Sequence, residues 1–198
     1  MRPSSGGVVY AGERKLRSGD PRAAIAAGVA HVPEDRLGTG VAPSLSIAEN
    51  TVIKSYRGRG VSIGPILNWR AIREQARDLI KRYGVATPGS QTRARDLSGG
   101  NLQKLVLGRE FSGKPKVLIA ASPTRGLDVG AIETVHAYLR QAAEDGVGVL
   151  LISEDLDEIR ALADRIVVIY EGKLTGSFDP ATATVAEIGL AMAGGGGE

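Results

Sequence analysis

Cysteine is absent from the 198-residue sequence, and only two histidines, His31 and His136, are present. The lack of cysteine excludes disulfide bonds and thiolate metal sites. Two histidines so far apart in the sequence do not indicate a metal cluster, so we expect each to have a packing or surface role. This composition fits a reducing, cytoplasmic setting.

Long apolar runs and a strong charge of one sign are also missing. The longest runs, VGVLLI at 147–152 and RIVVIY at 165–170, have the length of strands and fall far short of the roughly 20 residues that span a bilayer. The first residues lack the apolar core of a signal peptide. The net charge of +3 arises from 25 basic and 22 acidic residues that are interspersed along the chain. We therefore expect a soluble protein that does not bind nucleic acid.

The pattern that is present is typical of an α/β domain. Residues 7–33 predict two short strands around a small helix, which Asp20 caps and Pro21 opens. From about residue 97, helices alternate with apolar strands, a pattern typical of a parallel sheet covered on both faces. Those strands lie at 116–121, 147–152 and 165–170, and a short final strand and a glycine-rich tail follow them.

Residues 46–86 interrupt this pattern with a helical insert. Ser46 is expected to cap its first helix. Apolar residues at helical spacing predict a longer helix that ends at Gly84. They are Ile72, Ala76, Leu79, Ile80 and Tyr83.

Three segments occur in an order that resembles a known family. They are HVPEDR at 31–36, LSGGNLQK at 97–104 and, after an apolar strand, AASPTRGLDVGAIE at 120–133. Together they resemble the nucleotide-binding subunit of an ATP-binding cassette (ABC) transporter, and most of all the second ATPase half of importers for simple sugars or nucleosides. The resemblance covers nearly the whole chain.

The resemblance implies a fold and a division of the chain. The fold is α/β, a partial ABC-ATPase with the parallel sheet of P-loop NTPases and a helical signature subdomain. Four parts are expected: a truncated N-terminal part of the ATPase core at 1–45, the helical subdomain with the signature motif at 46–111, the C-terminal part of the core at 112–180, and a terminal helix with the glycine-rich tail at 181–198.

The resemblance also explains why two glycines begin a helix, where each costs roughly 0.8–1 kcal/mol relative to alanine. In the family this signature touches the γ-phosphate of ATP held by the opposite subunit, a role that the resemblance extends to Ser98, Gly99, Gly100 and Asn101. Ser98 would cap the helix, and the glycines would leave its first N–H groups open to an anion. A plain serine cap with tolerated glycines is the alternative. Asp128, at the D-loop position, would communicate across the dimer, cap the next helix, or both.

Several positions of the family's ATP site are altered. Ala121 and Ser122 stand where the family has an Asp that holds Mg²⁺ and a Glu that polarises water, and neither side chain can do that work. Glu34 replaces the Q-loop glutamine, and Glu154 replaces the switch histidine, where a carboxylate would repel a triphosphate. For both glutamates a solvated acidic loop end is the competing interpretation. We therefore assign no catalytic residue and no metal ligand to this chain.

The phosphate-cradling loop of the family is missing, since no G-x-x-x-x-G-K-[ST] segment occurs. RPSSGGVVYAGERKL, at 2–16, is similar to the stretch that follows the P-loop helix, so we expect Met1 to lie just after that helix. Without the family's P-loop strand, neighbouring strands such as 116–121 and 147–152 are expected to have unpaired backbone groups.

Three hypotheses follow. In the first, the chain is a non-catalytic module that lends its signature to a P-loop-bearing partner half, which holds most of the ATP and Mg²⁺. It would couple to an integral-membrane permease through a groove near Glu34 and the helical insert, and so be cytoplasmic and peripheral on the inner face of the cell membrane. The second is an ATP-hydrolysing subunit in its own right, against which the altered positions argue. The third is a remnant of a split or misassigned gene.

Overall fold

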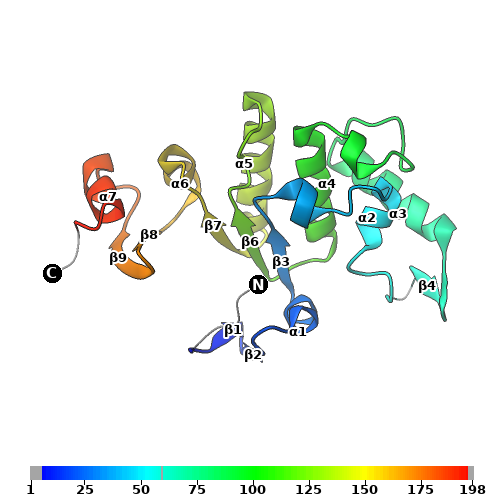
Figure 1. Ribbon diagram of the computed structural model, residues 1–198, viewed down its shortest axis with the longest axis horizontal. Coiled ribbons are helices and arrows are strands. Elements are labelled where there is room, and N and C mark those ends of the chain that lie inside the picture. Colours follow the sequence, from blue (N-terminus) through cyan, green and yellow to red (C-terminus); the bar gives the residue numbers. More distant parts are fainter. Residues whose placement is uncertain (1–5, 59, 196–198) are drawn as a thin grey trace. The chain divides into compact units, whose positions relative to one another are not determined.

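The structure is a computed structural model that describes residues 6–58 and 60–195. The chain forms two compact units, Met1–Leu150 (unit 1) and Leu151–Glu198 (unit 2). Figure 1 shows the elements of both. Among the described residues, no helix has the length and apolar character needed to cross a membrane.

A three-stranded sheet forms the centre of unit 1. Its order is β3 (Val29–Val32), β6 (Val117–Ala121) and β7 (Gly148–Ile152). β3 and β6 are parallel, with Val29 opposite Val117. The parallel α/β sheet is therefore confirmed.

The position of β6 corrects one expectation. β6 lies between β3 and β7, so its backbone is paired on both sides and the prediction of unpaired groups at 116–121 is wrong. β7 pairs only with β6 among the described residues of unit 1. Gly148 N–H donates to the carbonyl oxygen of Lys116 at 3.0 Å. Within unit 1, the outer edge of β7 has no partner strand among the described residues, and we call it the open edge.

The helices that follow β3 and β6 lie on one face of this sheet, and coverage of the other face by helices stays a prediction. Ala30, Val32, Leu118 and Ala120 are buried on one face, whereas Leu150 is 54% exposed on the other. β3, β6 and β7 follow one another in a single direction across the sheet. Right-handed crossovers that advance in one direction place their helices on the same face. The helices between these strands, α4 (Gly99–Ser112) and α5 (Val129–Glu144), accordingly pack against each other.

The helical insert between β3 and β6 has its own small core. Ser46 caps α2 (Ile47–Val52) in a capping box with Glu49, and the predicted long helix is α3 (Trp69–Arg82). Gly84 follows α3 with a φ of +58°, a conformation that favours glycine. The two predictions for this insert are confirmed. Its core consists of Ala48, Val52, Val61, Ile72 and Ala76, with Leu67 packed against them.

Shorter elements surround these helices and strands. The predicted small helix is α1, and Asp20 caps it by accepting from Ala23 N–H at 3.0 Å. Unit 1 also contains two hairpins and two single turns of helix: β1 (Val9–Ala11) with β2 (Arg14–Leu16), α1 (Pro21–Ala26), a π-helical turn at Arg36–Gly40, β4 (Ser62–Ile63) with β5 (Ile66–Leu67), and a 3-10 turn at Ala94–Asp96.

Unit 2 packs two helices against a hairpin. Its elements are α6 (Leu156–Leu162), β8 (Ile166–Tyr170), β9 (Lys173–Phe178) and α7 (Val185–Met192). The short final strand predicted after 165–170 is β9, and it pairs antiparallel with β8. The two residues that join them, Glu171 and Gly172, both have positive φ. So short a connection can only join antiparallel strands.

Candidate functional site

The signature helix α4 begins as predicted, with Ser98 as its N-cap. Ser98 Oγ accepts from the backbone N–H of Asn101 at 3.4 Å and from its side-chain amide at 2.9 Å. Because Ser98 only accepts in these contacts, its hydroxyl hydrogen is available to a further acceptor. Asn101 Oδ1 accepts from Ala86 N–H at 2.8 Å. Asn101 therefore braces the first turn of α4 against the preceding loop.

The two glycines of the signature differ in their surroundings. A Cβ on Gly99 would meet only the side chain of Leu127, at 3.8 Å, which is an ordinary contact. A Cβ on Gly100 would lie 3.1 Å from the Cβ of Ala131. A side chain at Gly100 would therefore require Ala131 to move by a few tenths of an ångström, whereas packing gives no reason for glycine at position 99.

Asp128 lies beside this turn. It is the N-cap of α5, and its Oδ1 accepts from Ala131 N–H at 2.9 Å. Ala131 is also the residue that Gly100 approaches. The structure thus brings Asp128 and the signature together at the N-terminal ends of two neighbouring helices (Figure 1).

The strand that precedes this region carries no metal ligand. β6 ends at Ala121, and Ser122 follows with a φ of +42°. A methyl group and one hydroxyl do not supply the hard oxygen ligands that Mg²⁺ requires, so these residues do not fit the ion. The described residues contain no group of three or more His, Cys, Asp or Glu that could hold a metal.

One link between the signature and β6 was not predicted. Gln103, fully buried on α4, donates from Nε2 to the carbonyl oxygen of Pro123 at 2.7 Å. This bond ties α4 to the segment just after Ala121. The one signal in the sequence that could have indicated this contact was a glutamine at a position where the pattern of the helix calls for an apolar residue.

The two glutamates at altered family positions have different surroundings. Glu34 forms an ion pair with Arg125, whose carbonyl oxygen accepts from Arg36 Nη2 at 2.5 Å. Both side chains of the Glu34 pair are exposed, so a pair of this kind adds little stability. Glu154 lies in unit 2, next to Asp155, which is the N-cap of α6.

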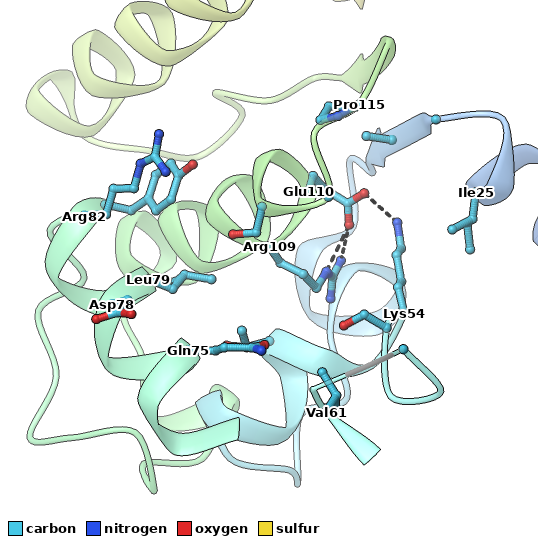
Figure 2. Close-up of a pocket in the computed structure, with 18 of the residues that line it drawn as sticks. Ile25, Lys54, Val61, Gln75, Asp78, Leu79, Arg82, Arg109, Glu110 and Pro115 are labelled. Atoms are coloured by element: carbon cyan, nitrogen blue, oxygen red, sulfur yellow. Dashed lines mark hydrogen bonds and ion pairs between the residues drawn. The ribbon is translucent and has the colours of Figure 1, made fainter. Parts of the chain in front are cut away.

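A cavity of about 510 Å³ lies elsewhere in unit 1 (Figure 2). It is bounded by the start of β3, the residues after α2, and α3 and α4. Glu34, at the other end of β3, is not among its lining residues. The cavity therefore lies beside the helical insert and not near Glu34, and the groove expected near Glu34 stays a prediction.

A buried ionic cluster forms one wall of this cavity. Glu110 accepts from Lys54 Nζ at 2.6 Å, from Arg109 at 2.9 Å and from the backbone N–H of His31 at 3.1 Å. The side chain of Glu110 is 2% exposed and that of Arg109 is 6% exposed. Desolvation, and then the positive charge of Lys54, lowers the pKa of His31 below its usual value, while Glu110 opposes the shift.

One segment approaches the missing phosphate-loop pattern without matching it. GREFSGKP, at 108–115, has the glycine and lysine spacing but ends in proline. Residues 108–112 belong to the last turns of α4, where the backbone N–H groups are bonded within the helix and so do not cradle a phosphate. This segment is therefore not a P-loop.

Comparison with known proteins agrees with this arrangement. The profile of the family described as "ABC transporter" matches residues 1–125. The chain belongs to the ABC transporter family. Its parallel α/β fold and the adjacency of signature and D-loop positions are consistent with that membership.

Named relatives extend over almost the whole chain. The chain is 42% identical over 194 residues to the guanosine import ATP-binding protein NupO of Bacillus subtilis, covering 98% of this chain and 38% of NupO. It is 43% identical over 198 residues to the glucose import ATP-binding protein TsgD13 of Haloferax volcanii, covering 99% and 36%. The chain thus spans little more than a third of the length of these relatives.

A solved structure supports the fold. The ATP-binding cassette MJ0796, in a dimeric post-hydrolysis state bound to ADP and phosphate, superposes with a TM-score of 0.70 at 22% identity. The superposition covers 89% of this chain and 74% of that cassette. At this identity the match shows the fold alone.

Proposed function

We propose that this chain is an ABC-ATPase component of a sugar or nucleoside import system. In this proposal it is a degenerate half that supplies its LSGG signature in trans to ATP on a P-loop-bearing partner half. The names of the relatives support the import role, since they include import proteins for guanosine, glucose and arabinose.

The observation that carries the proposal is the open first turn of α4. Ser98 keeps a hydroxyl hydrogen to donate, and no side chain crowds Gly99. The N-terminal end of a helix attracts anions because its first N–H groups have no partner within the helix. Gly99 and Gly100 have no side chain, so this turn leaves room beside Ser98 for a phosphate from another subunit. Asn101 braces the turn against the preceding loop, and Asp128 caps the neighbouring helix α5.

The residues at the end of β6 argue against ATP hydrolysis by this chain alone. ATP and Mg²⁺ would be held mainly by the partner half, because Ala121 and Ser122 offer no carboxylate for the metal or the attacking water. No residue of this chain is assigned a catalytic role. We expect its contribution to be stabilisation of the γ-phosphate charge from the opposite side.

An integral-membrane permease is the second partner that we propose. The cavity beside the helical insert is large enough for a few side chains of a partner segment and lies away from the signature turn. Docking there would place the protein in the cytoplasm, peripheral to the inner face of the cell membrane. The four parts at 1–45, 46–111, 112–180 and 181–198 would then be core, signature subdomain, core and terminal helix.

A chimera tests the signature role. The part of NupO that aligns with this chain is replaced by this chain, and the remaining NupO residues are expected to supply the P-loop half. ATP hydrolysis is measured with and without the permease. Gly99→Asp places a carboxylate where the phosphate should arrive, so hydrolysis at the shared site should collapse. Gly189→Asp is the matched control, because Gly189 is a helical glycine with nothing within 4 Å of a built Cβ.

Two outcomes would reject the proposal. If the Gly99→Asp chimera keeps its hydrolysis rate, the signature does not act in trans. If the pure chain hydrolyses ATP with Mg²⁺ and loses that activity on Ser98→Ala, it is an enzyme in its own right. A chimera that folds but shows no hydrolysis above that of the NupO remainder alone would favour the gene remnant.

A further inference from the structure

The β4–β5 hairpin exposes two large apolar side chains at its tip. Ile63 and Ile66 pair across the hairpin, and each is 71% exposed. Gly64 and Pro65 form the turn between them. Figure 1 shows the β4 end of this hairpin at the outer edge of unit 1, beyond α2 and α3. Water contact with two such side chains is costly, so a surface that covers them would gain by it.

Aromatic side chains flank the tip on both sides along the chain. Tyr56 and Trp69 are each 43% exposed. Tyrosine and tryptophan are enriched where one end of a side chain is apolar and the other is wet, which is the condition at the headgroup level of a bilayer. The apolar tip is thus flanked along the chain by two residues of the types that are enriched at a bilayer interface.

The sequence on both sides of the hairpin is basic as far as Arg73, after which Glu74 is the next charged residue. From residue 54 to residue 73 the sequence has Lys or Arg at positions 54, 57, 59, 70 and 73, and neither Asp nor Glu. Lys54 is already paired with Glu110. Arg57, Arg70 and Arg73 are exposed and make no ion pair within the described part of the chain, although Arg57 lies over the Tyr56 ring at 5.3 Å.

We propose that this hairpin, residues 61–67 with Arg57, Trp69, Arg70 and Arg73, binds directly to an anionic lipid surface. Ile63 and Ile66 enter the interface, and the three arginines attract lipid phosphates. Apolar burial and charge attraction add in such contacts. A protein partner of the same surface would need acidic residues opposite the arginines, whereas an anionic bilayer supplies phosphates without any such matching.

The proposal is separate from the signature role. The hairpin lies in the helical insert, and the vesicle experiment needs neither nucleotide nor a second subunit. Gly99→Asp should therefore leave lipid binding unchanged, so failure of one proposal does not imply failure of the other.

The chain carries its own reporter for this contact. Trp69 is the only tryptophan in the sequence. The full chain is mixed with vesicles of phosphatidylcholine containing phosphatidylglycerol, or of phosphatidylcholine alone, and both flotation and Trp69 emission are measured. We expect flotation and a blue shift with the anionic vesicles only, both weakened by salt because the attraction between charges is screened.

Two variants identify the surface. Ile63→Ser with Ile66→Ser should lower the partition coefficient at least about tenfold. Arg70→Gln with Arg73→Gln should lower it by roughly 25-fold at low salt. The control is Leu174→Ser, which changes a side chain of equal exposure, 72%, on the β8–β9 hairpin. Circular dichroism checks that each variant keeps its helix content.

Three results would overturn the proposal. Equal binding to neutral and anionic vesicles would remove the role of the arginines, and unchanged binding by the isoleucine variant would remove the role of the tip. A Trp69 shift that appears only in vesicles containing the purified permease would assign the hairpin to protein docking instead. If the isoleucine variant loses its helix content, the arginine variant decides alone.

Discussion

Gly100 lies so close to Ala131 that a Cβ on Gly100 would be 3.1 Å from the Ala131 Cβ, whereas a Cβ on the neighbouring Gly99 would make only an ordinary contact with Leu127 at 3.8 Å. The two adjacent glycines of this motif thus have different structural roles. Gly100 allows α4 and α5 to approach each other, which positions Asp128 beside the signature. Gly99 leaves the first turn of α4 uncovered, which matters only if a ligand or partner comes there.

Stability measurements can separate these two reasons. Gly99→Ala should be neutral or stabilising by up to about 1 kcal/mol, because alanine favours the helix. Gly100→Ala should destabilise by about 1–3 kcal/mol through overpacking against Ala131. Urea unfolding followed by Trp69 fluorescence gives both values. Equal effects of the two substitutions would contradict this assignment.

The sequence predicted those features that depend on local chemistry. The caps at Ser46, Ser98 and Asp128 and the buried face of α3 follow from residue type and spacing, and the structure has each of them. The parallel pairing of β3 with β6 also agrees with prediction, because apolar strands separated by helices have few other solutions.

Contacts between distant residues could not be predicted in this way. Glu110 meets Lys54 and the backbone of His31 across 56 and 79 residues of sequence. Periodicity does not show which side chains a fold brings together at such separations. The β8–β9 turn escaped prediction because Glu171 adopts a positive φ, which is uncommon for residues other than glycine. Whether the signature residues contact a phosphate stays a prediction, because it concerns another subunit.

The buried ionic cluster gives a second prediction. Glu110→Gln keeps the shape of the side chain but removes the negative charge that faces Arg109 and Lys54. A buried charge that loses its partner costs about 3–5 kcal/mol, so we expect a loss of unfolding free energy of that size. Glu34→Gln, in the exposed pair with Arg125, is the control and should change stability by less than about 1 kcal/mol. Similar losses of unfolding free energy at both positions would show that the effect does not depend on the burial of the Glu110 cluster.

The lowered pKa of His31 predicts a dependence of stability on pH. Below the ordinary histidine pKa of 6.5, the unfolded chain binds a proton at His31 that the folded chain resists. The unfolded state is then favoured, so the free energy of unfolding falls as the pH drops from 6.5 toward the lower folded pKa, and it is unaffected by this group above that window. Urea unfolding at pH 7.5 and 5.5 should show this loss.

Substituting each histidine in turn shows which of them causes the loss of unfolding free energy at low pH. His31→Gln should remove that part of the pH dependence, and His136→Gln, which retains His31, should keep it. Work above pH 5 avoids the titration of Glu49, whose pKa is lowered chiefly by its hydrogen bond from the Ser46 hydroxyl. A pH dependence that persists in His31→Gln would place the responsible group elsewhere.

The open edge of β7 gives the last prediction, in which two adjacent amides should behave differently. Gly148 N–H points to β6. Because a strand repeats every two residues, the amide of Leu150 also faces β6, whereas that of Val149 faces the open edge. Hydrogen exchange should therefore be slow at Leu150 and fast at Val149, with Leu118 of the central strand slow throughout. About a quarter of the MJ0796 cassette lies outside the part superposed here, which is 74% of it. We expect that a strand–helix segment taken from a relative and fused to the N-terminus of this chain would pair with this edge. We expect the fusion to slow exchange at Val149, to leave Leu118 unchanged and to sharpen the urea transition. It should not create ATP hydrolysis, because Ala121 and Ser122 are still in place. Slow exchange at Val149 in the unfused chain would mean that another strand already covers the edge and that the fused segment has no place in this sheet.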